Sequence, residues 1–232
     1  RSNWQNKGWR IPAHEQWFNS LMLVQCVKSL SNLGTLNLFI YVNLMQKLIG
    51  QPEIILSDRM VGEIEIRNAT NDDVGKILSI DNTVFSTAWS PSFLRQQLCS
   101  EKCSHRVIEK TDTIIGHSGL IRLHDEGHVT TMAVSPKNQG FGLGSLLLAD
   151  LCSSAIDLNL ATITLEVRVG NLKAQNLYQK FGFVPAGVRP NYYSDTSEDA
   201  LIMWLSDLFD EKVQQTIQET KEKFLLTGVK NG

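Results

Sequence analysis

The sequence predicts a mixed α/β domain that begins near residue 60. From Met60 onward, segments with the alternating pattern of strands are followed by segments whose apolar residues recur at helical spacing. A glycine-rich turn before Ser145 joins a strand to a long helix, as is common in this class. The composition of the 232 residues, 42% hydrophobic and 20% charged, is that of a globular chain with a packed core.

The charge distribution indicates three parts. Residues 1–59 hold six basic and three acidic residues, whereas the rest of the chain holds 16 basic and 21 acidic ones. We expect residues 1–59 to form an amphipathic or poorly ordered extension, and Met60 offers an alternative start of the protein. Residues 60–206 would form the α/β domain. Residues 207–232 would form a charged C-terminal helix and tail, docked by a narrow apolar stripe.

Composition and charge exclude several classes of protein. The formal net charge of −2 argues against direct nucleic-acid binding. Asparagine, glycine and threonine interrupt the apolar run at residues 29–46, so no stable membrane insertion is expected. Four cysteines in a chain of this length form neither a disulfide framework nor a pattern typical of a zinc site. We therefore expect a cytoplasmic protein without a metal.

The first half of the domain is predicted to hold one strand, two short helices and then three antiparallel strands. Thr70 or Asn71 can cap a helix that ends before Ser86, and Pro91 can open a second helix. Turn residues separate the strands that follow. The expected elements are a strand from residue 63, helices at 71–85 and 91–98, and strands at 105–109, 114–123 and 128–134.

The second half is predicted to alternate helices and strands. A long helix begins at Gly142, because apolar residues recur on one face as far as Ile156. Gly182 ends a shorter helix that starts at Leu172. The expected elements are helices at 142–156, 172–181 and 207–226, and strands at 162–167, 184–188 and 200–205.

The glycine-rich turn carries the most specific chemical signal. Gly140, Gly142 and Gly144 occupy alternate positions between a strand end and a helix. Such a turn lets the backbone approach a ligand closely, and the helix N-terminus favours an anion. The pattern predicts a pyrophosphate cradle or, alternatively, only a tight connection. A P-loop would need a lysine after its glycines, and a dinucleotide fingerprint would place its first glycine directly after the strand.

The pattern Gln139-x-x-Gly142-x-Gly144 resembles the acetyl-CoA signature (Q/R-x-x-G-x-G/A) of the GNAT superfamily of N-acetyltransferases. Further segments resemble the bacterial RimI group within it: residues 165–168, Asn171, Ala174, residues 177–183, 189–193 and 198–203. The resemblance covers residues 63–205. It implies the GNAT acyl-CoA N-acyltransferase fold, a mixed and mostly antiparallel seven-stranded sheet flanked by helices, with acetyl-CoA bound where the sheet splays.

The resemblance also implies direct acetyl transfer from acetyl-CoA to the N-terminal alanine of a small-subunit ribosomal protein. An α-amino group has a reference pKa of ~7.8 against ~10.4 for lysine, so it is deprotonated at a cost about 3.5 kcal/mol lower. This favours an N-terminus as acceptor. The alternatives are other N-termini, lysine or a small amine, and, in another class, a non-catalytic acyl-CoA-binding module.

The resemblance assigns roles to individual residues. Glu166 would be the general base, through a water, although the residue taken alone favours a surface ion pair with Arg168. Tyr178 would be the general acid, although a lone helical tyrosine is often a core residue. The cofactor residues would be Met132, Ala133 and Val134 for pantetheine, the amides of Gly140, Phe141, Gly142, Leu143, Gly144 and Ser145 for pyrophosphate, and Asn171.

The same resemblance places Trp89, Tyr192 and Tyr193 on the substrate side, where packing alone would also explain them. His128 begins the cofactor strand; we interpret it as structural, with a part in a proton relay as the alternative. The presence of both Glu166 and Tyr178 argues against the non-catalytic alternative.

Overall fold

A computed structural model describes residues 64–225 and 229–231, so the expectations for residues 1–59 lie outside the described residues. The strands are β1 Ile64–Asn68, β2 Cys103–Lys110, β3 Thr113–Leu123, β4 Glu126–Val134, β5 Thr162–Arg168, β6 Val184–Tyr193, β7 Glu198–Leu205 and β8 Val229–Asn231. The helices are α3 Val74–Val84, α4 Pro91–Leu98, α5 Leu143–Asp157, α6 Leu172–Lys180 and α7 Glu211–Leu225, with short 3-10 turns η2 Asn71–Asp73 and η3 Pro136–Asn138.

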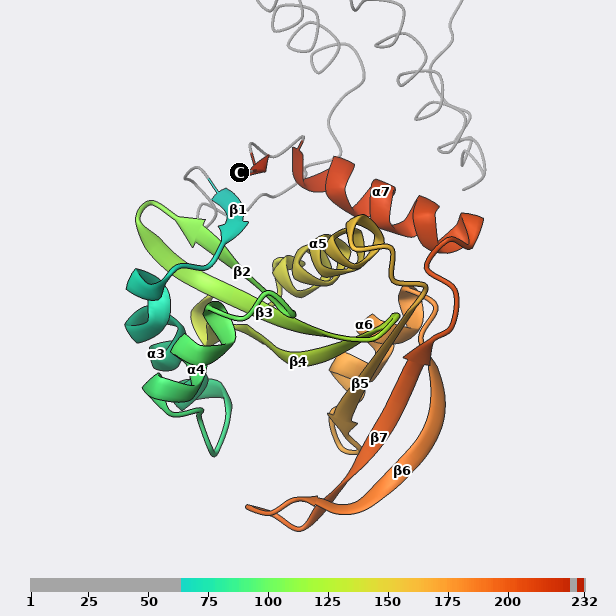
Figure 1. Ribbon diagram of the computed structural model, residues 1–232, viewed down its shortest axis with the longest axis horizontal. Coiled ribbons are helices and arrows are strands. Elements are labelled where there is room, and N and C mark those ends of the chain that lie inside the picture. Colours follow the sequence, from blue (N-terminus) through green and yellow to red (C-terminus); the bar gives the residue numbers. More distant parts are fainter. Residues whose placement is uncertain (1–63, 226–228, 232) are drawn as a thin grey trace, which may run out of the picture. The chain divides into compact units, whose positions relative to one another are not determined.

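The strands form one mixed sheet in the order β6-β7-β5-β4-β3-β2-β1-β8 (Figure 1). The pairs β4–β5 and β1–β8 are parallel, and the other neighbours are antiparallel. The predicted mixed, mostly antiparallel seven-stranded sheet flanked by helices is therefore confirmed. The short β8 is an addition that the sequence did not predict, because its pairing with β1 joins segments far apart in the chain.

Two element boundaries differ from the prediction by about four residues or more. Strand β6 continues to Tyr193 instead of ending near Val188, since it pairs with β7 along most of its length. Helix α7 begins at Glu211 rather than at residue 207. The Asp210 carboxylate accepts hydrogen bonds from the backbone N–H groups of residues 212 and 213, at 2.9 and 3.2 Å, and so caps the helix at that point.

The sheet opens between its two central parallel strands. Strands β4 and β5 pair only over Glu126–His128 and Thr162–Thr164. Just beyond, β4 contains a bulge, because Thr130 has no opposite residue between the pairs formed by its two neighbours with β3. A bulge bends its strand, so β4 turns away from β5 after His128 (Figure 1).

Each face of the sheet carries its own core. On one face α5, α6 and α7 cover the sheet, and Leu148, Ala149 and Cys152 of α5 are fully buried there. On the other face α3 and α4 pack through Ile77 and Leu94. The apolar spacing of the sequence therefore predicted the helices that pack on the sheet. Among the described residues, no helix is both long and apolar enough to cross a membrane.

Candidate active site

The opening beside β4 presents backbone groups that face away from β3. The Ser135 N–H donates to the Ile115 carbonyl of β3 at 2.8 Å. Successive N–H groups alternate along a strand, so the N–H and C=O of Val134 point to the side where β5 has diverged. The Val134 carbonyl accepts a hydrogen bond from Gln139 Nε2 at 3.0 Å. Met132, two residues earlier, has the same backbone orientation, which leaves its N–H and that of Val134 directed into the opening.

The glycine-rich turn lies at the end of the same strand. Gly140 and Gly142 have φ values of +88° and +82°, in the left-handed region that glycine adopts readily. Gly142 is the N-cap of α5 and has no side chain to satisfy the first-turn amides. The Ser145 N–H donates to the Gly142 carbonyl at 2.8 Å and is thus engaged within the turn. The amides of residues 143 and 144 have no acceptor among the described backbone groups, so this end of the helix can receive an anion.

Glu166 lies on the face of β5 opposite α5, because its neighbours Leu165 and Val167 point into the α5 core. Its side chain is only 7% exposed. One carboxylate oxygen lies 3.2 Å from His128 Nε2, and the other lies 3.1 Å from a terminal guanidinium nitrogen of Arg189. These contacts give the carboxylate two basic neighbours at the point where β4 and β5 separate.

The alternative ion pair between Glu166 and Arg168 is not formed. Arg168 instead pairs with Asp195 at 2.8 Å and with Glu198 at 3.2 Å. Its guanidinium also lies 3.9 Å from the centre of the Tyr193 ring. Arg168 therefore fixes the tip of the β6–β7 hairpin to the end of β5 and leaves the Glu166 carboxylate to other partners.

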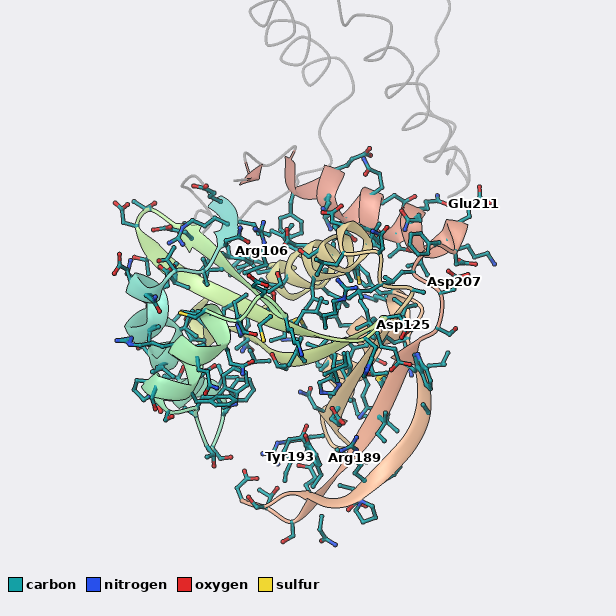
Figure 2. All side chains as sticks on the ribbon, in the orientation of Figure 1. Arg106, Asp125, Arg189, Tyr193, Asp207 and Glu211 are labelled. Atoms are coloured by element: carbon teal, nitrogen blue, oxygen red, sulfur yellow. The ribbon has the colours of Figure 1, made fainter. Side chains whose placement is uncertain are left out.

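Tyr193 interacts electrostatically with this carboxylate, whereas none of the described contacts of Tyr178 reaches it. Tyr178 of α6 is buried against Phe183, with ring centres 5.8 Å apart, and burial raises its pKa above the usual range. Burial, aided by Tyr192 and the Glu166 carboxylate and opposed by Arg168, raises the pKa of Tyr193 to about 12. Both phenols consequently keep their protons at neutral pH. Figure 2 shows Tyr193 and Arg189, which extend from β6 toward β5.

The other predicted substrate-side residues divide into two groups. Tyr192 is 46% exposed and lies edge-on to Tyr193 at 5.1 Å, which places it beside the candidate site. Trp89 packs in the core beneath α3 and α4, edge-on to Phe93 at 5.1 Å, and none of its described contacts reaches Glu166. The loop that carries Trp89 nevertheless faces the site.

This loop reaches the β6–β7 hairpin through one hydrogen bond. The Ser86 hydroxyl donates to the Asp195 carboxylate, so residues 85–90 and the hairpin tip meet across the opening. Asn171, predicted to contact the cofactor, caps α6: its side-chain oxygen accepts from the Ala174 N–H at 3.1 Å.

Sequence reasoning missed several of these contacts. His128 had been interpreted as structural, yet its Nε2 contacts Glu166 while its Nδ1 lies 3.0 Å from the Thr164 hydroxyl. This pair depends on the parallel register of β4 and β5, with His128 opposite Thr164, which becomes visible only in the structure. Neither the approach of Arg189 to Glu166 nor the Ser86–Asp195 contact has a local sequence signal.

The splayed sheet, the turn at an α-helix N-terminus and the buried carboxylate together define an N-acetyltransferase. Residues 74–183 match the model of the acetyltransferase (GNAT) family. A relative from Bacillus subtilis (strain 168), provisionally named a ribosomal protein bS18-alanine N-acetyltransferase, is 35% identical over 142 residues, which cover 61% of this chain and 94% of the relative. The chain belongs to the GNAT acetyltransferase family, whose members use acetyl-CoA, and the predicted family is confirmed.

Two further relatives support the same class. An N-alpha-acetyltransferase from Sulfurisphaera tokodaii is 31% identical over 154 residues, covering 61% of this chain and 92% of that protein. The crystal structure of the ribosomal-protein-S18-alanine N-acetyltransferase from Escherichia coli matches with a TM-score of 0.57 and 29% identity, over 61% of this chain and 92% of that chain.

Proposed function

We propose that this protein acetylates the N-terminal alanine of a small-subunit ribosomal protein, with acetyl-CoA as the acetyl donor. The observation that carries the proposal is the buried Glu166 carboxylate at the point where β4 and β5 separate, next to backbone groups of β4 directed into the opening. The names of the Bacillus subtilis and Escherichia coli relatives support this acceptor. The ribosome-associated acceptor would be consistent with a cytoplasmic protein.

The residues present fit acetyl-CoA. A side-chain atom built at Gly140 would meet nothing within 4 Å, so the turn leaves open space beside its backbone. The amides of residues 140–145 would hold the pyrophosphate, those of residues 143 and 144 foremost because they lie in the first turn of α5 and have no acceptor among the described backbone groups. Backbone groups of residues 132–134 would hold the pantetheine, and Asn171 would border it. Acetyl-CoA supplies the acetyl group as a thioester when bound.

Glu166 would act as the general base. An incoming α-amino group must be neutral to attack, and its low reference pKa of ~7.8 means that a weak base suffices. The carboxylate would accept the amine proton directly or through a water, and His128 Nε2, 3.2 Å away, would carry that proton onward toward solvent. Arg189 is 55% exposed, so the incoming amine could displace it from the carboxylate.

Tyr178 would act as the general acid. Burial keeps its phenol protonated, so it has a proton to give to the departing thiolate as the carbon–sulfur bond breaks and the carbon–nitrogen bond forms. The Val134 N–H would donate to the carbonyl oxygen as that oxygen gains charge. No side chain needs to become acylated, so the proposed transfer is direct.

The loop around Trp89 and the β6–β7 hairpin would guide the acceptor. The Ser86–Asp195 hydrogen bond joins the loop to the hairpin across the opening. The passage that the two segments enclose would admit an extended chain terminus more easily than a folded surface. Tyr192 and Tyr193 would line this path on the hairpin side. This arrangement supports an N-terminal amine over an internal lysine.

The test is transfer from acetyl-CoA to two matched peptides. One begins with the ribosomal protein's alanine, and the other has that amine blocked and a lysine free. Mass spectrometry locates the acetyl group. Modification confined to the free alanine is the expected result, and Tyr178→Phe should slow it about tenfold to a hundredfold without weakening coenzyme A binding. Transfer to lysine instead, or no transfer to either peptide, would overturn the proposed substrate.

A further inference from the structure

Helix α7 lies outside the part of the chain that matches the family model, yet it reaches the glycine-rich turn. The contact is made by Phe224, in the last turn of the helix, whose side chain is buried. A Cβ atom built at Gly142 would lie 3.1 Å from Phe224 Cζ. The ring is thus packed directly on the Cα of the residue that caps α5.

The opposite end of α7 is fixed to the end of α6. Val213 is buried in the core, and a Cβ atom built at Gly182 would lie 3.2 Å from its Cγ2. Between these ends α7 runs along α5 (Figure 1). The helix therefore connects the two helices that border the proposed acetyl-CoA site, α5 at its start and α6 at its end.

Few contacts within the glycine-rich turn itself restrict its conformation, so packing from another element is needed to hold it. Two of its residues, Gly140 and Gly142, are in the left-handed region, and glycine has more backbone freedom to lose than any other residue. On the strand side, the hydrogen bond from Gln139 to the Val134 carbonyl fixes the turn. On the helix side, Gly142 has no side chain of its own, and the Phe224 ring fills the space beside it.

We propose that Phe224 is a positioning residue for the glycine-rich turn that would bind the pyrophosphate. Helix α7 would thus contribute to coenzyme binding through Phe224. By packing on Gly142, the ring holds the turn in the binding conformation before the ligand arrives, so that less conformational freedom is lost on binding. This inference rests on the proposed acetyl-CoA site. It predicts a selective effect on ligands that carry the pyrophosphate.

The experiment compares Phe224→Ala with Val213→Ala, which removes a similarly buried apolar group from the other end of the same helix. Calorimetry measures coenzyme A binding at a temperature at which both variants are folded. Hydrogen exchange reports on the amides of residues 139–145. Transfer kinetics are run with acetyl-CoA and with S-acetylpantetheine, which lacks the pyrophosphate.

We expect Phe224→Ala to raise the dissociation constant for coenzyme A about tenfold and to speed exchange in the turn, with no change in kcat/KM for S-acetylpantetheine. Val213→Ala should change none of these, and Phe224→Leu should recover part of the affinity. Equal weakening by the two alanine variants, or unchanged affinity in Phe224→Ala, would overturn the inference. Failure of the unmodified protein to bind coenzyme A would instead refute the proposed cofactor site.

Discussion

Two pairs of a histidine and a carboxylate lie on the sheet face opposite α5, and they differ mainly in access to solvent. Asp81 and His117 are 2.8 Å apart, and neither side chain is more than 4% exposed. Glu166 and His128 are 3.2 Å apart, but His128 is 27% exposed. The same residue types thus occur in a sealed pair and in a pair that can exchange a proton with its surroundings.

Strand pairing explains the difference. His117 lies on β3, which is paired along both sides, by β2 and by β4, and α3 covers it with the apolar residues that flank Asp81. His128 is the last residue of β4 that pairs with β5, so the two strands are no longer hydrogen-bonded to each other beyond it. The comparison teaches that the end of strand pairing beside His128, more than the residue types, exposes a histidine–carboxylate pair to solvent and substrate.

The largest expected effect, a loss of kcat, comes from replacing the carboxylate of the solvent-accessible Glu166–His128 pair. Glu166→Gln keeps the size of the side chain but cannot take a proton, so kcat should fall about a thousandfold. Binding of coenzyme A should stay within about twofold, because the proposed cofactor contacts are backbone groups elsewhere. Steady-state kinetics and calorimetry measure the two quantities. Unchanged turnover would remove Glu166 from the mechanism.

Substitution in the buried Asp81–His117 pair should reduce stability and leave catalysis nearly unchanged. Asp81→Ala leaves His117 buried without its hydrogen-bond partner, which should lower the free energy of unfolding by about 2 kcal/mol. Urea unfolding measures this loss. The kcat per folded molecule should remain within a factor of about two, and Asp81→Asn, which can still hydrogen-bond, should lose less. A catalytic defect as large as that of Glu166→Gln would contradict the comparison.

Local patterns in the sequence were sufficient for the elements on which this comparison rests. The spacing of apolar residues predicted α3 and α5, and Pro91 marked the start of α4. The glycines at 140 and 142 predicted the turn because a left-handed backbone has a strong residue preference. These features depend on neighbours within a few residues, which a single sequence displays.

The partners of Glu166 could not be predicted in this way. His128 and Arg189 come from strands on either side, 38 residues before and 23 residues after it. Their approach depends on strand register, on the bulge in β4 and on the length of β6, and none of these has a local signature. The resemblance to the GNAT family could suggest a base and an acid, but not which side chains surround the base.

A further test of the sealed region uses His105, which lies beside His117 beneath Trp89. Burial first, and His117 second, lower the His105 pKa to about 4, while Asp81 opposes the shift. Below about pH 6.5 the unfolded chain therefore binds a proton at His105 that the folded protein does not. The contribution of His105 to the free energy of unfolding is therefore fully present above about pH 6.5 and is lost as the pH falls from there through about 4. The total loss is about 3 kcal/mol.

The measurement is urea unfolding at intervals between pH 7 and 4, for the unmodified protein and for His105→Leu. The variant should show a flatter dependence in this window, whatever its stability at pH 7. Asp73 gives an internal reference, because Arg67 holds its pKa down to about 2, so its contribution is lost only below about pH 4. His124→Asn, an exposed control, should keep the original slope. An equal slope in His105→Leu and the unmodified protein would show that burial does not hold the His105 pKa down.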